Sequence, residues 1–276
     1  MAIDSIKNFI RMLRQSPPGA VFNPWWQIDE ENDISPHSPA IRRKHLALYF
    51  SERLGNAPVA IVGEALGYRG GHFSGIPMTS ERMLLGKTPK PVAALYERRN
   101  LLPNHGGHAR QPPFQSYGVL GRPPLQIIAG IKPRRTSKPD ICPDGFSEPT
   151  ATIVWGALLK IGVLPGEFVL WNAFPWHSFD PHRGLLSNRM PNKSEQLSGR
   201  PVLKAFLELF PCEQIVALGK IAAAQLEQLD FNAHCVRHPA SGGAKLFRQQ
   251  IARIVADPTS ELRTSAPRRS FLPLAK

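Results

Sequence analysis

Cysteine is scarce in this chain of 276 residues, and its three copies lie far apart, at Cys142, Cys212 and Cys235. No CxxC pair occurs, so we expect no zinc or iron–sulfur site built on thiolates. The histidines show no HExxH spacing either. An odd, scattered set argues against a disulfide framework and fits a reducing compartment. The sequence therefore predicts a protein that works without a metal or other cofactor.

Long apolar runs and a signal-peptide pattern are missing as well. No run approaches the roughly 20 residues that span a bilayer, and Asp4 and Lys7 interrupt the N-terminus early. Acidic residues are few: 21 Asp and Glu stand against 34 Lys and Arg, which gives a net charge of +13. Because long apolar runs are missing, we expect no membrane partner. A polyanionic partner, nucleic acid first, is favoured over a soluble enzyme that is merely basic.

Nucleotide-binding signatures are absent from the glycine-rich segment at residues 63–71, which follows a predicted strand. The segment has neither GxGxxG spacing nor a GK[ST] ending, so it does not predict a bound nucleotide phosphate. Its glycines more simply let the backbone come close to a ligand.

The chain does contain short apolar runs, each followed directly by a polar residue. Continuous apolar runs of this length, separated by helical stretches, predict buried parallel strands. The runs cover residues 59–63, 168–171, 215–219 and 233–237. The polar residues that follow are Glu64, Asn172, Lys220 and His238. Because ligands bind at the carboxyl ends of strands in such sheets, these side chains form a candidate site.

Apolar residues at helical spacing fill the intervals between the runs. The order of strands and helices predicts an α/β fold in three αβα layers, with helices on both faces of the sheet. Ser147 is expected to cap the helix that starts near Pro149, and residues 22–26 to form an aromatic loop. The expected helices cover residues 3–15, 39–54, 90–101, 149–162, 199–210, 219–229 and 242–256.

The length favours a single domain over residues 1–256. A helical extension at 1–54 precedes its first strand, and an insertion rich in proline, glycine and basic residues interrupts it at 103–147. Residues 257–276 are expected to be a flexible basic tail.

Each strand-end residue has a chemical interpretation and a structural alternative. Glu64 suits a general base or a residue that positions water, rather than a capping or salt-bridged carboxylate. Asn172 can read a base edge, or its amide can satisfy loop backbone. His238 can donate to a developing anion, or it is an ordinary structural histidine. Lys220 is a phosphate contact or a solvated lysine, and His177 is a candidate for the rim of the site.

The segment after His238 suggests a second kind of contact. Ser241, Gly242 and Gly243 precede a predicted helix, and backbone amides at a helix start bind phosphate well. Lys245 follows in the first turn.

Taken together, these pieces resemble the uracil-DNA glycosylase superfamily over roughly residues 55–255. The segment from Gly63 to Gly67 resembles the family's Gly-Glu-Ala-Pro-Gly motif. The segment from His238 to Ser241 resembles its His-Pro-Ser or His-Pro-Ala motif. Asn172 falls at the strand end where the family keeps an asparagine that reads uracil.

The resemblance implies a four-stranded, mostly parallel sheet between helices, and cleavage of the N-glycosidic bond of a flipped-out deoxyuridine. It implies that Glu64 positions water or stabilises the sugar cation, that Asn172 bonds uracil, and that His238 stabilises charge on the uracil oxygen. Residues 241–246 take the position of the family's wedge loop in this comparison.

The pocket motif departs from the family at several positions. Leu66 stands where proline is usual, and Ala65 where the best-known branch has aspartate. Gly67, with Tyr68 beside it, replaces a tyrosine that excludes thymine. Met78 replaces a stacking phenylalanine, a role that either Met78 or Phe73 can take. The wedge lacks its leading leucine, leaving Lys245 or Leu246 for that position.

The resulting hypothesis is a monofunctional, metal-free glycosylase that excises uracil during bacterial base-excision repair. Its expected partner is uracil-containing DNA, and it is expected to be a monomer in the cytoplasm, associated with the nucleoid. Two alternatives stay open: a non-catalytic module that senses uracil or abasic sites, and a glycosylase for another deaminated base such as hypoxanthine.

Overall fold

The computed structural model describes residues 2–87, 127–128 and 132–256. The helix predicted at 90–101, most of the insertion and the predicted tail at 257–276 lie outside these residues. Within the described part of the chain, no helix is both long and apolar enough to cross a bilayer.

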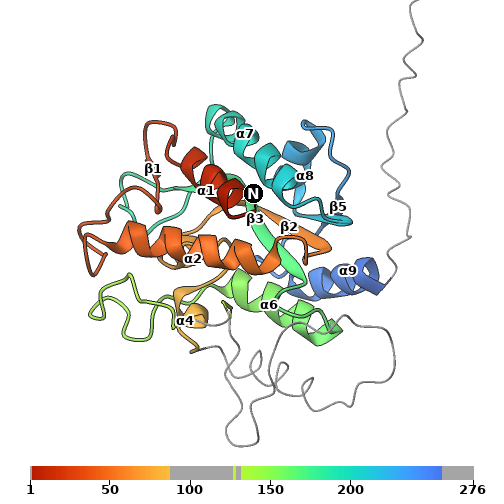
Figure 1. The fold of residues 1–276 in the computed structure, drawn as a ribbon, viewed down its shortest axis with the longest axis horizontal. Coiled ribbons are helices and arrows are strands. Elements are labelled where there is room, and N and C mark those ends of the chain that lie inside the picture. Colours follow the sequence, from red (N-terminus) through yellow and green to blue (C-terminus); the bar gives the residue numbers. More distant parts are fainter. Residues whose placement is uncertain (1, 88–126, 129–131, 257–276) are drawn as a thin grey trace, which may run out of the picture.

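A five-stranded sheet with the order β1-β3-β2-β4-β5 forms the centre of the molecule (Figure 1). All neighbouring pairs are parallel except β1 and β3, which are antiparallel. The predicted α/β class with a mostly parallel sheet is confirmed, and the count of four strands is wrong. The strands are β1 (Val21–Phe22), β2 (Val59–Leu66), β3 (Phe168–Ser178), β4 (Gln214–Leu218) and β5 (His234–Val236).

The missed strand β1 overlaps, at Phe22, the segment 22–26 that was predicted as an aromatic loop. It pairs through Val21 with Ser178 and through Phe22 with His177. Two residues are too few to show the period of a strand in the sequence, so only the presence of a partner defines it. That partner is the far end of β3, which runs past Asn172 to Ser178.

Helices cover both faces of the sheet (Figure 1). Five of the predicted helices lie within three residues of the expected bounds, and two short helical turns after β2 were not predicted. The helices are α1 (Ala2–Met12), α2 (Ser38–Arg53), α3 (Gly71–Ser74), α4 (Glu81–Leu84), α6 (Pro149–Ile161), α7 (Lys193–Leu209), α8 (Lys220–Glu227) and α9 (Ala244–Ala256).

Aromatic packing fixes β3 between the two helical layers. On one face the Trp171 ring meets Phe9 of α1 at 5.1 Å and stacks on Phe206 of α7 at 5.2 Å. Phe168, three residues earlier, points to the other face, where Trp155 of α6 meets it edge-on at 4.7 Å. All five side chains are buried, and each contributes on the order of 2–3 kcal/mol through burial. The backbone next to Asn172 is therefore held from both sides.

Helix α7 begins at Lys193, earlier than the predicted start at residue 199. A capping box between Asn192 and Glu195 starts the helix at Lys193, and Pro201 lies inside it. Gly199, nearly two turns into the helix, lets α7 approach β3 closely: a Cβ there would lie 2.6 Å from the carbonyl oxygen of Ala173. Gly199 thus allows close packing of α7 on β3 next to the site.

The start of α6 also differs from the prediction. Glu148, not Ser147, is the N-cap residue, Pro149 follows it, and the Glu148 side chain makes no capping hydrogen bond. The carboxyl group is turned instead toward the glycine-rich segment after β2.

Candidate active site at the carboxyl ends of the strands

The sheet register brings the predicted strand-end residues to one edge. Gly63 of β2 pairs with Asn172 of β3, and one row earlier Val62 aligns with Ala217 of β4. Ala217 in turn aligns with Cys235 of β5. The residues at or just beyond these rows are Glu64, Asn172, Lys220 and His238.

Asn172 is the most unusual side chain at this edge. It is 1 % exposed, yet neither its Nδ2 nor its Oδ1 has a hydrogen-bond partner among the described residues. Leaving a buried polar atom unpaired costs about 1–3 kcal/mol. A ligand with a donor and an acceptor side by side would recover that cost, since the amide offers both kinds of group.

Gly63 makes room for this amide. A Cβ on Gly63 would lie 2.6 Å from Asn172 Oδ1 and 3.2 Å from the sulfur of Met78. Gly63 was predicted to let a ligand come close to the backbone. In the structure, the side chains of Asn172 and Met78 occupy that space.

Met78 contacts the site from a strained backbone position. Its φ is +48°, and the Trp155 indole N–H donates to its carbonyl oxygen at 3.2 Å. Phe73, the other candidate for stacking on a base, is fully buried. Its ring stacks on Phe146 at 4.6 Å and meets His72 at 4.4 Å. Because neighbours cover the Phe73 ring, Met78 is the better candidate for a base-facing side chain.

Glu64 lies within the last three residues of β2 rather than after the strand. Its neighbours Gly63 and Ala65 pair with Asn172 and Phe174 of β3, so the backbone on both sides is fixed. The Glu64 side chain is half-buried and forms no hydrogen bond or ion pair with the residues described. Burial raises the pKa of this carboxyl above its ordinary value. The group is neither a helix cap nor part of a salt bridge here.

His238 has one ring nitrogen engaged and one available. Its Nδ1 accepts the backbone N–H of Ala240 at 3.1 Å. Burial, and to a smaller extent the charge of Arg237, lower the pKa of His238 below its ordinary value. The imidazole is therefore neutral at pH 7, and because Nδ1 accepts, its single proton sits on Nε2. That N–H is free to donate to a ligand.

The turn after His238 depends on two special backbone positions. Ser241 and Gly242 have φ values of +50° and +77°. A Cβ on Gly243 would overlap the carbonyl oxygen of His238, so only glycine fits. The turn thus holds the backbone of His238 against the start of α9.

Cationic and apolar side chains surround this turn. Lys245 and Leu246 lie in the first turn of α9, and both are exposed. Lys220 is the first residue of α8 and is also exposed. Neither lysine forms an ion pair within the described part of the chain.

Sequence reasoning missed a second carboxyl group beside the glycine-rich segment. A Cβ on Gly67 would lie 3.7 Å from Glu148 Oε1 and 3.7 Å from the Asn188 amide, and a Cβ on Gly70 would overlap the Glu148 carboxyl. Glu148 Oε2 is buried without a partner, and burial raises the pKa of Glu148 to about 7. Asn188 Oδ1 accepts the backbone N–H of Tyr68 at 3.0 Å. The position of Glu148 just before Pro149 suggested only a helix start.

His177 does not line the rim of the site. It is fully buried, and a line of hydrogen bonds runs from Asp29 through His72 and His177 to the carbonyl oxygen of Ser187. Burial lowers the pKa of His177 to about 3, so its one proton goes to that carbonyl. His177 Nδ1 then accepts, so His72 Nδ1–H donates to it. These groups support the loop after β2 from behind.

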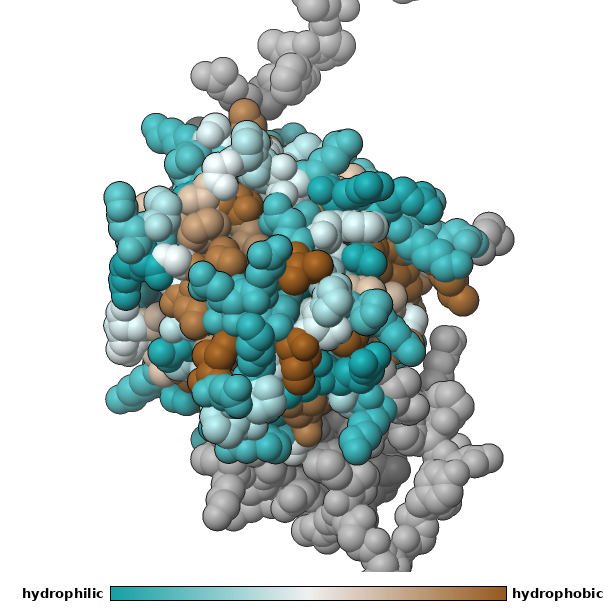
Figure 2. All heavy atoms as spheres, turned by 90° about the vertical axis from the view of Figure 1, so that its left-hand side faces the viewer, coloured by the Kyte–Doolittle hydropathy of each residue, from teal (hydrophilic) through white to brown (hydrophobic). Residues whose placement is uncertain are grey.

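The described residues contain no group of three or more His, Cys, Asp or Glu side chains that could hold a metal ion. β1 pairs with the last two residues of β3, so the side of Figure 1 on which β1 lies is the carboxyl edge of β3. Figure 2 shows that side: polar and charged side chains cover most of it, with apolar ones in separate groups. Such a face suits a polar, charged ligand.

No protein-family model matches this sequence, and no curated protein matches it. Among solved structures, the crystal structure of wild-type SMUG2 from Pedobacter heparinus aligns with a TM-score of 0.55 and 12 % sequence identity. The alignment covers 92 % of this chain and 97 % of that chain. SMUG2 is a member of the uracil-DNA glycosylase superfamily, so the predicted resemblance is confirmed at the level of fold. The chain has the fold of the uracil-DNA glycosylase superfamily.

Proposed function

We propose that this protein is a DNA glycosylase that flips uracil out of DNA and hydrolyses its N-glycosidic bond, leaving an abasic site. The observation that carries the proposal is the Asn172 amide, which is buried and unpartnered beside Glu64 at the edge where the fold binds ligands. A buried amide without partners fits a base edge better than it fits a purely structural role.

The chemistry of the amide fits the edge of a deaminated base. Uracil presents an N–H next to a carbonyl oxygen, so Asn172 Oδ1 can accept the first while Nδ2–H donates to the second. Cytosine and adenine present an acceptor next to an amino group at the same edge, the reverse pattern, which the amide would meet only when turned by about 180°. Hypoxanthine shares the uracil pattern, which makes it the second candidate substrate.

The proposed reaction passes through an oxocarbenium-like sugar and a departing uracil anion. As the glycosidic bond breaks, its electron pair leaves with uracil, and His238 Nε2–H donates to the oxygen that gains charge. The Glu64 carboxylate stabilises the sugar cation and accepts a proton from the water that attacks it. Met78 packs on the base face, less rigidly than an aromatic ring would.

DNA contacts are proposed for the turn and helix start that follow His238, and for Lys220. The amides of Ser241, Gly242 and Gly243, with Lys245, can bind phosphate, and Leu246 can fill the space that the base leaves. Flipping a base costs a few kcal/mol, which such contacts offset.

The test uses duplexes that each carry one uracil, hypoxanthine or mismatched thymine, followed by alkali to cut abasic sites. We expect cutting at uracil and a rate for Glu64→Gln that is lower by about 100-fold or more. Glu227→Gln, an exposed change in α8, serves as the matched control and should leave the rate unchanged. Cutting only at hypoxanthine would favour the second substrate. Tight binding without any cutting would favour a non-catalytic sensor and sink the enzyme proposal.

A further inference from the structure

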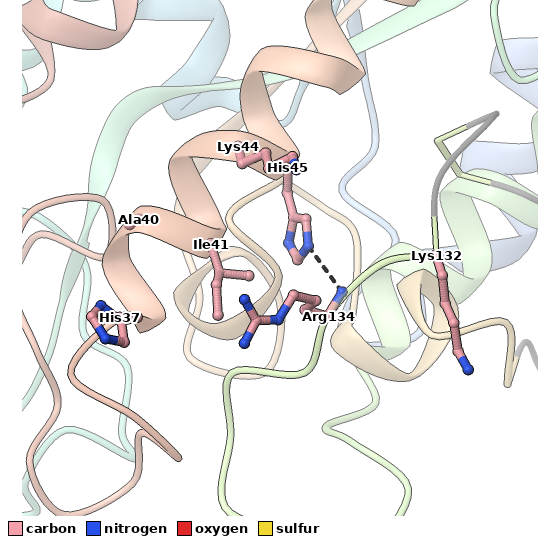
Figure 3. Close-up of a pocket in the computed structure, with 7 residues that line it drawn as sticks. All are labelled: His37, Ala40, Ile41, Lys44, His45, Lys132 and Arg134. Atoms are coloured by element: carbon pink, nitrogen blue, oxygen red, sulfur yellow. Dashed lines mark hydrogen bonds between the residues drawn. The ribbon is translucent and has the colours of Figure 1, made fainter.

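A cavity of about 340 Å³ lies between the first half of α2 and the chain segment that contains Arg134 (Figure 3). Lys44, Lys132 and Arg134 give it three cationic side chains, and the histidines His37 and His45 also line it. None of its lining residues is acidic.

One wall of this cavity is built by His45. Its Nδ1–H donates to the carbonyl oxygen of Ser74 at 3.0 Å, and its Nε2 accepts the backbone N–H of Arg134 at 3.2 Å. Both ring nitrogens are therefore used in holding the two segments together, and the histidine is neutral. Figure 3 shows the second of these bonds and the Arg134 side chain running back beneath Ile41. The backbone that carries the guanidinium is thus fixed.

The three cations of the cavity lack counter-charges. No ion pair within the described part of the chain involves Lys44, Lys132 or Arg134, and all three are exposed. The nearby Arg42 differs, because it is buried and bonded to Asp33 through both terminal nitrogens. Three unpaired positive charges around one concave surface repel one another and attract an anion.

The cavity lies on the flank of the candidate site. Arg53, at the end of α2, donates to the carbonyl oxygen of Phe168 at the start of β3, so this end of α2 lies at the amino edge of the sheet. The helix then runs back for 16 residues, or about 24 Å, toward the carboxyl edge. Its bond from His45 to Ser74 reaches the short helix that follows the glycine-rich segment.

We propose that this cavity binds a backbone phosphate of the DNA strand, at a point beyond the flipped nucleotide. The inference rests on the proposed function and adds a contact that the motifs do not predict. A guanidinium can bind a phosphate through two parallel N–H groups, and a lysine adds a point charge. The exposure of all three cations lets a phosphate within a polymer reach them, and the net charge of +13 favours such a partner.

The experiment measures binding of a duplex at a series of salt concentrations by fluorescence anisotropy. The variant Lys44→Ala/Arg134→Ala removes two cations, so the slope of log K against log[salt] should fall in magnitude by about two. Binding at low salt should weaken by about tenfold or more. Lys160→Ala/Arg253→Ala is the matched control, because these exposed cations lie in the last turns of α6 and α9 and do not line the cavity. Its slope should match that of the wild-type protein.

The possible results separate this inference from the proposed function. An unchanged slope in Lys44→Ala/Arg134→Ala, with uracil excision intact in the wild-type protein, overturns the phosphate site alone. If the slope falls in the variant but the wild-type protein excises no base, the phosphate site is supported and the glycosylase proposal is overturned. A second arm adds inorganic phosphate and follows Tm. If the variant loses stabilisation by inorganic phosphate but keeps the DNA slope, the cavity is a free-anion site and the DNA assignment is overturned.

Discussion

Two groups of buried polar side chains in this molecule differ in how completely they are hydrogen-bonded. Between α2, α4 and the segment after residue 132, Arg42 bonds Asp33, and Glu81 accepts two backbone N–H groups at 2.7 and 3.0 Å. At the carboxyl edge of the sheet, the Asn172 amide and one oxygen of Glu148 are buried without partners. Paired groups hold the fold, whereas unpaired ones store a cost that a ligand can relieve.

Two asparagines show the contrast most clearly, since each is 1 % exposed. Asn23 donates to the carbonyl oxygen of Leu13 at 2.6 Å and accepts the N–H of Trp25 at 3.2 Å. Asn172 makes no such bond. Burial alone therefore does not distinguish these two asparagines, but their hydrogen-bond partners do.

The largest effect is expected where a fully bonded charge is removed. Arg42→Met leaves the Asp33 carboxylate buried and unpaired, so the free energy of unfolding should fall by about 3–5 kcal/mol in urea titrations. The excision rate of the molecules that remain folded should not change. Arg253→Met, an exposed change in α9, should cost less than about 0.5 kcal/mol. A loss for Arg42→Met as small as that of the control would break the comparison.

Glu64→Gln should have the next largest effect, on rate rather than on stability. Single-turnover excision should slow by about 100-fold or more, while the free energy of unfolding stays within about 0.5 kcal/mol of the wild-type value. The pH profile gives a second check. Because burial raises the pKa of Glu64, activity should be lost on acidification at a pH above the ordinary carboxyl range. An identical acid limb in Glu64→Gln would show that another group titrates.

The two asparagines should respond in opposite ways when each is changed to alanine. Asn172→Ala should lower excision by about 10- to 100-fold and leave stability unchanged or slightly higher. Asn23→Ala should lower the free energy of unfolding by about 1–3 kcal/mol and leave excision per folded molecule unchanged. Excision and urea unfolding measured on both variants test the pair. Equal loss of stability in both would mean that Asn172 is structural.

The smallest effect is expected at Glu148, where burial raises the pKa to about 7. The folded state holds this proton more tightly than the unfolded state, so the stabilisation is full below about pH 4.5 and is lost as the pH rises through 7. The free energy of unfolding should drop by on the order of 1–3 kcal/mol over that range. Glu148→Gln should remove this drop. A drop of the same size in the variant would assign it to other groups.

The sequence could predict the parallel strands and their shared edge, because burial on both faces leaves continuous apolar runs such as 168–171. It placed Glu64, Asn172 and His238 correctly at that edge through topology alone. It could not predict β1, whose two residues become a strand only by pairing with Ser178.

Contacts between distant segments also escaped prediction. Glu148 meets Gly70 only after α6 packs beside the loop, and His177 joins His72 only through the bulged end of the sheet. Local pattern carries no signal for such pairs, because tertiary packing decides them. These contacts therefore could not be part of a site predicted from the sequence.

The central claim is that the Asn172 amide is kept free for the edge of a deaminated base. The most direct measurement is the side-chain amide NMR signal of Asn172, assigned by its loss in Asn172→Asp. It is followed as a duplex with a non-cleavable deoxyuridine analogue is added. We predict that the signal moves downfield with this duplex and does not move with a matched duplex carrying cytosine. An Asn172 signal that stays in place while the uracil duplex binds would contradict the account.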